Sequence, residues 1–175
     1  MAFTVAAIVG ALLVLFVIVG AIVFKGGVSG RTFYIPSQAM VPTLQQDDRV
    51  HATPLDDDDA IERGQIIIFD RPPLETDTSI EFLTKRVVGL PGETIESRDG
   101  KVFINGEPLA ESYLGPETLT DGLPVTVVPA SSYFVMGDNR TDSFDSRAFA
   151  PIERSLIKYR VDKIIYPLGR RTDLP

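Results

Sequence analysis

A dense polar stretch at residues 136–147 holds the side chains best suited to chemistry. Ten of the twelve residues in Met136-Gly-Asp-Asn-Arg-Thr-Asp-Ser-Phe-Asp-Ser-Arg147 are polar, charged or glycine, and they follow an apolar, strand-like run at 133–136. A polar turn at the end of a strand is a common way to place reactive groups on a rigid support. The stretch offers the hydroxyls of Ser143 and Ser146 and a possible ion pair between Asp145 and Arg147. The same composition also fits a solvated turn, so other segments must decide.

Two other segments carry candidate reactive residues. In the segment 35–44, Pro36 and Pro42 favour extended backbone at the residues before them, which predicts a stiff, extended loop. In the segment 84–93, Lys85 opens a β-branched strand that ends at Pro91 and Gly92. Taken alone, Lys85 is more typical of a surface lysine than of a catalytic base.

Together and in this order, the segments resemble the type I signal peptidases. These are membrane-bound proteases that use a serine and a lysine to release signal peptides from exported proteins. The matching motifs are Pro36-Ser-Gln-Ala-Met-Val-Pro-Thr-Leu44, Arg63-Gly-Gln65, Lys85-Arg-Val-Val-Gly-Leu-Pro-Gly92 and Gly137-Asp-Asn-Arg-Thr-Asp-Ser-Phe-Asp-Ser-Arg147. The resemblance spans nearly the whole chain. It departs from the family pattern at one position that matters greatly: where the family has its nucleophilic serine, this chain has Ala39.

The resemblance implies a role for each remaining site residue. Lys85 would be the general base and Ser143 would orient its amine. The Ser37 hydroxyl and the backbone N–H of residue 39 would bind the oxyanion. Asp145 and Arg147 would form a supporting ion pair that fixes the loop.

The resemblance also implies the substrate, an extended peptide with small residues one and three positions before the cut. Ile35, Met40 and Phe82 are the expected substrate-binding residues, since apolar edge strands near Ile35 and Phe82 could pair with a peptide by strand addition. No cofactor and no metal are expected. The partners implied are the signal peptides of preproteins, the lipid bilayer and, by proximity, the protein-export machinery.

Ala39 has a plain chemical consequence. A methyl group has no lone pair, so it cannot attack a carbonyl carbon or form an acyl-enzyme. Ser37 lies two residues away, and misplacement by even about 1 Å can cost on the order of a hundredfold in rate. We therefore expect the chain to be inactive as written.

Three hypotheses remain open. The first is a signal peptidase with an engineered serine-to-alanine change, which the intact remainder of the motifs favours. The second is a natural, non-catalytic protein that binds signal peptides. The third is a self-cleaving, repressor-type Ser–Lys peptidase, which the apolar N-terminal segment, the acidic balance and the Gly-Asp-Asn-Arg motif disfavour.

A lysine base must be neutral to accept a proton. A free lysine has a pKa near 10.4 and is almost fully charged at pH 7, but burial among apolar side chains can lower its pKa by several units. Leu83 and Val87 alternate with Lys85 on one strand face, and Met40 follows the nucleophile position. These residues are expected to form an apolar wall around the amine.

The run from Phe3 to Phe24 contains no charge. As a helix of about 1.5 Å per residue it would span roughly 33 Å, enough for a bilayer core of about 30 Å. This predicts a membrane anchor at 1–25, followed by a flexible linker at 26–34. Lys25 and Arg31 would place the remainder in the cytoplasm by the positive-inside rule, whereas the family resemblance implies the outer side of the plasma membrane. We adopt the family's orientation.

Residues 35–175 are expected to form a mainly β, antiparallel peptidase domain, with 93–132 as a reduced second lobe. Strands are predicted at 49–53, 65–69, 81–88, 94–98, 101–104, 125–128, 133–136 and 156–166. The net charge of −7 argues against nucleic acid as a partner, and the absence of cysteine excludes disulfides and thiolate metal sites. His51 is interpreted as a strand surface residue.

Overall fold

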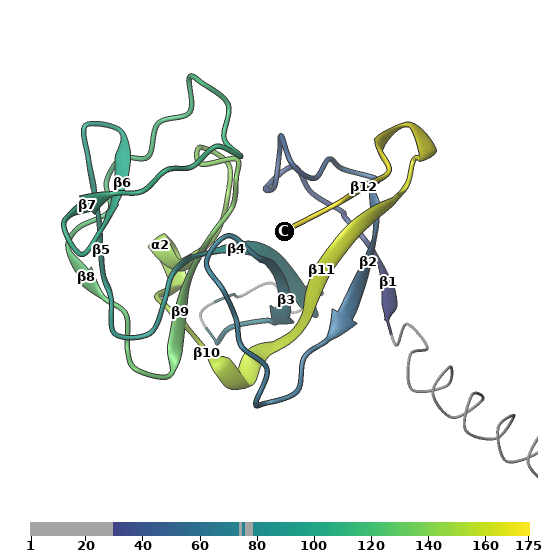
Figure 1. The fold of residues 1–175 in the computed structure, drawn as a ribbon, viewed down its shortest axis with the longest axis horizontal. Coiled ribbons are helices and arrows are strands. Elements are labelled where there is room, and N and C mark those ends of the chain that lie inside the picture. The colour runs from purple at the N-terminus through teal and green to yellow at the C-terminus, as the bar shows by residue number, and fades with distance from the viewer. Residues whose placement is uncertain (1–29, 74, 76–78) are drawn as a thin grey trace, which may run out of the picture.

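The computed structural model describes residues 30–73, 75 and 79–175, which form two antiparallel β-sheets (Figure 1). The predicted anchor at 1–25 and most of the predicted linker lie outside these residues. No helix within the described part of the chain is both long and apolar enough to span a membrane.

The larger sheet has eight strands and carries the candidate site. Its order is β1-β2-β11-β3-β4-β9-β10, and β12 pairs with β11. The strands are β1 (Arg31–Tyr34), β2 (Arg49–Pro54), β3 (Ile66–Asp70), β4 (Phe82–Gly89), β9 (Ser132–Met136), β10 (Ile152–Glu153), β11 (Ile157–Tyr166) and β12 (Thr172–Asp173). The long strand β11 therefore lies inside the sheet, between β2 and β3, and does not form its edge.

The smaller sheet lies within residues 93–132, the segment expected to form a second lobe, and is called the second lobe below. Its order is β7-β6-β5-β8, with β5 (Thr94–Arg98), β6 (Lys101–Ile104), β7 (Glu107–Pro108) and β8 (Thr126–Val127). The β5–β6 turn places Asp99 and Gly100 at positive φ angles, as the Asp-Gly pair predicts. In the chain the lobe is inserted between β4 and β9, and in space it lies to one side of the larger sheet (Figure 1).

Buried apolar side chains form three clusters. One cluster lies under β1, β2 and the end of β11 and includes Met40 and Leu44. A second lies around β3, β4 and β9 and includes Leu83 and Val87. The third joins the second lobe to β9 and includes Ile95 and Phe134. The loop with Ala39 is thus anchored in the first cluster, and the strand with Lys85 in the second.

The mainly β, antiparallel prediction is confirmed, with several local differences. Residues 31–34, assigned to the linker, form β1, because their backbone pairs with Arg49–Ala52 of β2. His51 is partly buried and its Nδ1 lies 3.1 Å from a carboxylate oxygen of Asp162, so it is not a simple surface residue. A short helix α2 (Ser146–Phe149), not predicted, ends the polar stretch. It is capped by Asp145, and 3₁₀ turns η1 (Arg154–Leu156) and η2 (Leu168–Arg170) flank β11.

Candidate active site

A groove of about 440 Å³ brings the predicted nucleophile position and the predicted base together. Ala39 and Lys85 both line it, and so does Ser37. The three residues expected to bind substrate, Ile35, Met40 and Phe82, line the same groove. Segments about 45 residues apart in the chain therefore meet at one site.

The loop that carries Ala39 is held at both ends by buried side chains. Ile35 and Met40 are each 2% exposed, and Leu44 is fully buried. The N–H of Leu44 donates to the carbonyl of Met40 at 2.9 Å, which closes a single helical turn. The predicted stiff, extended loop is therefore wrong in this part. The backbone turns because Met40 and Leu44 both pack into the first apolar cluster.

Lys85 lies in a setting that favours its neutral form. The residue is 5% exposed, and burial lowers the pKa of its ammonium group, an effect that Asp145 partly opposes. Leu83 and Val87, predicted to share its strand face, both belong to the second apolar cluster. A lysine that sheds its proton more easily than usual suits a general base.

Backbone atoms connect the Ala39 loop to the polar stretch. The carbonyl of Ala39 accepts a hydrogen bond from the N–H of Asn139 at 3.1 Å, and the carbonyl of Gln38 accepts one from the Asn139 side chain at 3.2 Å. A Cβ at Gly137 would lie 2.2 Å from Ser143 Oγ and 2.4 Å from the Ala39 carbonyl oxygen. Only glycine fits at 137, because Ser143 and the Ala39 loop both lie against this position and leave no space for a side chain.

The Ser143 hydroxyl is buried at this junction. Among the described residues, its Oγ has no hydrogen-bond partner, although its proximity helps to lower the pKa of the Asp145 carboxyl. The expected role of orienting the Lys85 amine therefore stays a prediction. The N–H of Ala39 likewise has no bonded acceptor within the described part of the chain, which leaves it available to an oxyanion.

Asp145 and Arg147 form an ion pair. Two nitrogens of the Arg147 guanidinium donate to the two carboxylate oxygens of Asp145, at 2.9 and 2.8 Å. Burial raises the pKa of Asp145, but the bonds and charge of Arg147 outweigh it and hold the pKa below its usual range. Asp145 also accepts from the N–H of Gly137 at 3.0 Å, so the pair holds the start of the polar stretch against its end.

The sequence interpretation missed a second polar network, which attaches the inserted lobe to the larger sheet. Arg86 donates twice to Asp138, at 2.8 and 2.7 Å, and both residues are 1% exposed. The Arg86 guanidinium carbon also lies 3.9 Å from the ring centre of Tyr113. The available signal was the position of Arg86 directly after Lys85, since neighbouring strand residues point to opposite faces.

Arg140 completes this lobe–sheet network. Its guanidinium donates to both carboxylate oxygens of Glu111 and to the hydroxyl of Thr120. Its Nε donates to the carbonyl of Gly137 at 3.1 Å. The polar stretch that contacts Ala39 is therefore also fastened to the second lobe.

Comparison with known proteins shows the family. The chain matches the family described as "Signal peptidase, peptidase S26" over residues 4–166, and it belongs to that family. It is 36% identical to a signal peptidase I of Leptolyngbya laminosa, over 82% of this chain and 75% of that protein. It is 39% identical to signal peptidase I V of Bacillus subtilis, over 55% of this chain and 62% of that protein. A crystal structure of an Enterococcus faecalis signal peptidase I superposes with a TM-score of 0.48 at 31% identity, over 57% of this chain and 94% of that one.

Proposed function

We propose that this chain is a signal peptidase I whose site lacks only the nucleophile, so that it binds the end of a signal peptide without cutting it. The observation that carries this proposal is Lys85, which is buried, has a lowered pKa and lines one groove with Ala39. Burying a lysine is costly, and strongly perturbed ionisable groups concentrate at functional sites.

With serine at position 39, the site would perform acyl transfer. The neutral Lys85 amine takes the proton of the serine hydroxyl as its oxygen bonds to the carbonyl carbon of the peptide. The N–H of residue 39 and the Ser37 hydroxyl bind the resulting oxyanion. The lysine ammonium then gives its proton to the departing amine, and water, deprotonated by the same lysine, hydrolyses the ester. Ala39 prevents the first step and leaves the groove and the N–H in place.

The packing of the groove walls supports a preference for small side chains near the cut. Ile35 and Met40 are almost fully buried beneath it, and Phe82 packs edge-on against Phe33 at 5.9 Å between ring centres. Such packed apolar walls leave room for alanine more readily than for a large ring. The proposed ligand is therefore a signal peptide that ends in an Ala-x-Ala pattern.

Two origins of Ala39 fit this site, an engineered change and a natural pseudo-protease. Retention of a buried lysine favours the first. Without catalysis to serve, replacement of Lys85 by an apolar residue would stabilise the fold.

We further propose that the protein is anchored in the plasma membrane by Phe3–Phe24, with the peptidase domain on the extracytoplasmic side. The uncharged run supports the anchor, and membership of the signal peptidase family supports the orientation. Signal peptides reach such a domain from the bilayer, beside the export machinery.

Ala39→Ser tests the proposal. The variant should cut a preprotein after small residues in a detergent gel assay, while the parent chain should bind the peptide and return it intact by mass. In the active background Lys85→Ala should abolish cleavage, and Lys158→Ala, at a half-exposed position of β11 outside the groove, should not. Metal chelators should have no effect. A well-folded Ala39→Ser variant that cuts nothing would instead favour the natural pseudo-protease.

A further inference from the structure

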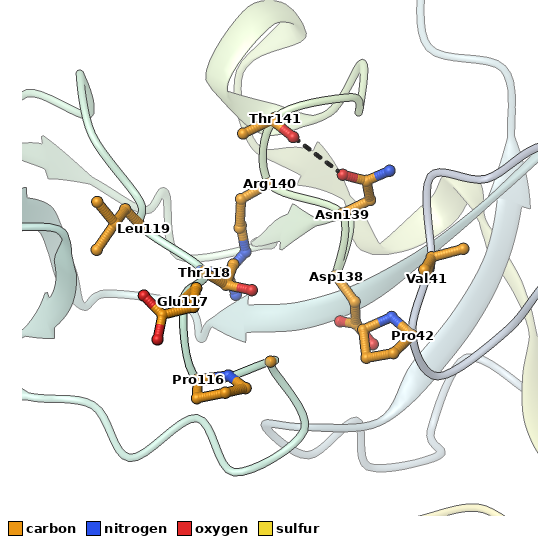
Figure 2. A pocket seen from close by; sticks show the side chains of 11 residues that line it. Val41, Pro42, Pro116, Glu117, Thr118, Leu119, Asp138, Asn139, Arg140 and Thr141 are labelled. Atoms are coloured by element: carbon orange, nitrogen blue, oxygen red, sulfur yellow. Dashed lines mark hydrogen bonds between the residues drawn. The ribbon is translucent and has the colours of Figure 1, made fainter.

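A second pocket, of about 490 Å³, adjoins the active-site groove. The Ala39 loop and the polar stretch 136–147 each contribute residues to both. The groove is lined by residues up to Met40 and by Asp142, and the second pocket by Val41, Pro42 and residues 138–141. Its remaining wall is the segment 115–119 of the second lobe (Figure 2). Figure 2 shows Val41, Pro42 and Asp138 facing Pro116 and Thr118 across this space. A volume of this size suits a ligand site.

The wall from the second lobe is fastened at both ends. Before it, Glu111 pairs with Arg140 and the ring of Tyr113 lies on Arg86. After it, the hydroxyl of Thr120 accepts from Arg140. These contacts are buried, since Thr120 is 1% and Arg140 4% exposed. The pocket is therefore built before a ligand arrives, which lowers the entropy lost on binding.

We propose that the second pocket binds the residues that follow the cut, the first residues of the exported protein. This inference rests on the proposed function. The scissile carbonyl must lie at the N–H of Ala39, so an extended peptide that fills the groove has to continue past that residue. An extended chain advances about 3.3 Å per residue. Beyond Met40 in one loop and before Asp142 in the other, the residues that follow the groove line the second pocket.

The charges of the pocket indicate which sequences it favours. Asp138 is paired with Arg86, and Arg140 with Glu111. The third charged residue that lines the pocket, Glu117, has no ion-pair partner among the described residues. A basic residue shortly after the cut should therefore bind better than an acidic one, by about two- to fivefold, the range of an exposed ion pair.

The full chain, which does not consume its ligand, allows a direct test in detergent. One labelled peptide ends at the cut with an amidated Ala-x-Ala sequence, and a second continues for four residues. The longer peptide should bind about tenfold more tightly, the effect of burying roughly one more apolar side chain. Thr118→Trp should fill the pocket and remove this gain. It should leave binding of the short peptide unchanged, which also shows that the variant is folded.

Thr172→Trp is the matched control, because it adds the same side chain at an exposed position of β12. Lysine in place of glutamate after the cut should improve binding to the parent, and Glu117→Gln should remove that difference. If both peptides bind equally, the inference is wrong and the proposed function stands. If neither binds, both are wrong. If only the longer peptide binds and Thr118→Trp abolishes this, the second pocket is supported and the groove's proposed role is not.

Discussion

Asp138→Asn should destabilise the protein far more than the same change at the surface. Arg86 and Asp138 are both 1% exposed, so the substitution leaves a buried guanidinium without its counter-charge. Asparagine keeps one acceptor oxygen, and thus one of the two bonds at 2.8 and 2.7 Å is lost with the charge. A hydrogen bond to a charged group contributes about 1.5–3 kcal/mol, and breaking a buried ion pair costs about 3–5 kcal/mol.

Arg86 keeps other partners, which places the cost near the lower end of this range. Its guanidinium still donates to the carbonyl of Gly64 at 2.6 Å and still lies on the ring of Tyr113. We expect a loss of about 3 kcal/mol in the free energy of unfolding, or roughly 6–12 °C in Tm for a domain of this size.

The assay is urea and thermal unfolding of the full chain in detergent, followed by circular dichroism. Asp70→Asn is the matched control, because Asp70 pairs with Lys158 at 3.4 Å and both side chains are 42% exposed. That change should cost less than about 1 kcal/mol. The reasoning fails if the two variants lose equal stability, or if Asp138→Asn lies within about 1 kcal/mol of the parent chain.

Three other predictions concern the site and the N-terminal segment. Gly137→Ala should abolish binding of the Ala-x-Ala peptide in a titration, because its Cβ would lie 2.4 Å from the Ala39 carbonyl oxygen; unchanged affinity would contradict the packing. Lys85→Met should raise the free energy of unfolding at neutral pH, and Lys101→Met, at an exposed position, should not. Because the folded-state pKa of Lys85 is lowered, the parent gains stability as pH rises from that pKa towards the ordinary 10.5, so the advantage of Lys85→Met should shrink over this window. The full chain should partition into detergent, and deletion of residues 1–25 should increase its solubility; recovery of the full chain in buffer alone would refute the anchor.

The sequence predicted the strands well where local signals agree. The hairpin of β5 and β6 has the predicted bounds, because alternation and an Asp-Gly turn indicate the same register. The predicted strand 81–88 appears as β4, shifted by one residue at each end. The loop 35–44 was mispredicted, since two prolines favour extended backbone but the burial of Met40 and Leu44 turns the chain.

The site, too, was predicted only in part. Ala39 and Lys85 are close in space but far apart in the chain, and only the ordered motifs could associate them. The contacts of Glu111 and Tyr113 could not be predicted, because they join an irregular loop to the other sheet and follow no period. Position in the chain did indicate where the second lobe lies, between the lysine strand and the polar stretch.

The insertion of the second lobe has a consequence for how the chain tolerates changes in length. Strands β4 and β9 are antiparallel neighbours, so without residues 90–131 they would form an ordinary hairpin. The entropy cost of closing a loop rises by only about 0.6 kcal/mol for each doubling of its length. Additions at the exposed β6–β7 turn, around Asn105 and Gly106, should therefore hardly affect pairing of the larger sheet. Shortening of the segment 111–120 would separate Glu111 or Thr120 from Arg140, or Tyr113 from Arg86. The contacts with these two arginines of the larger sheet and the polar stretch therefore constrain the length of this loop.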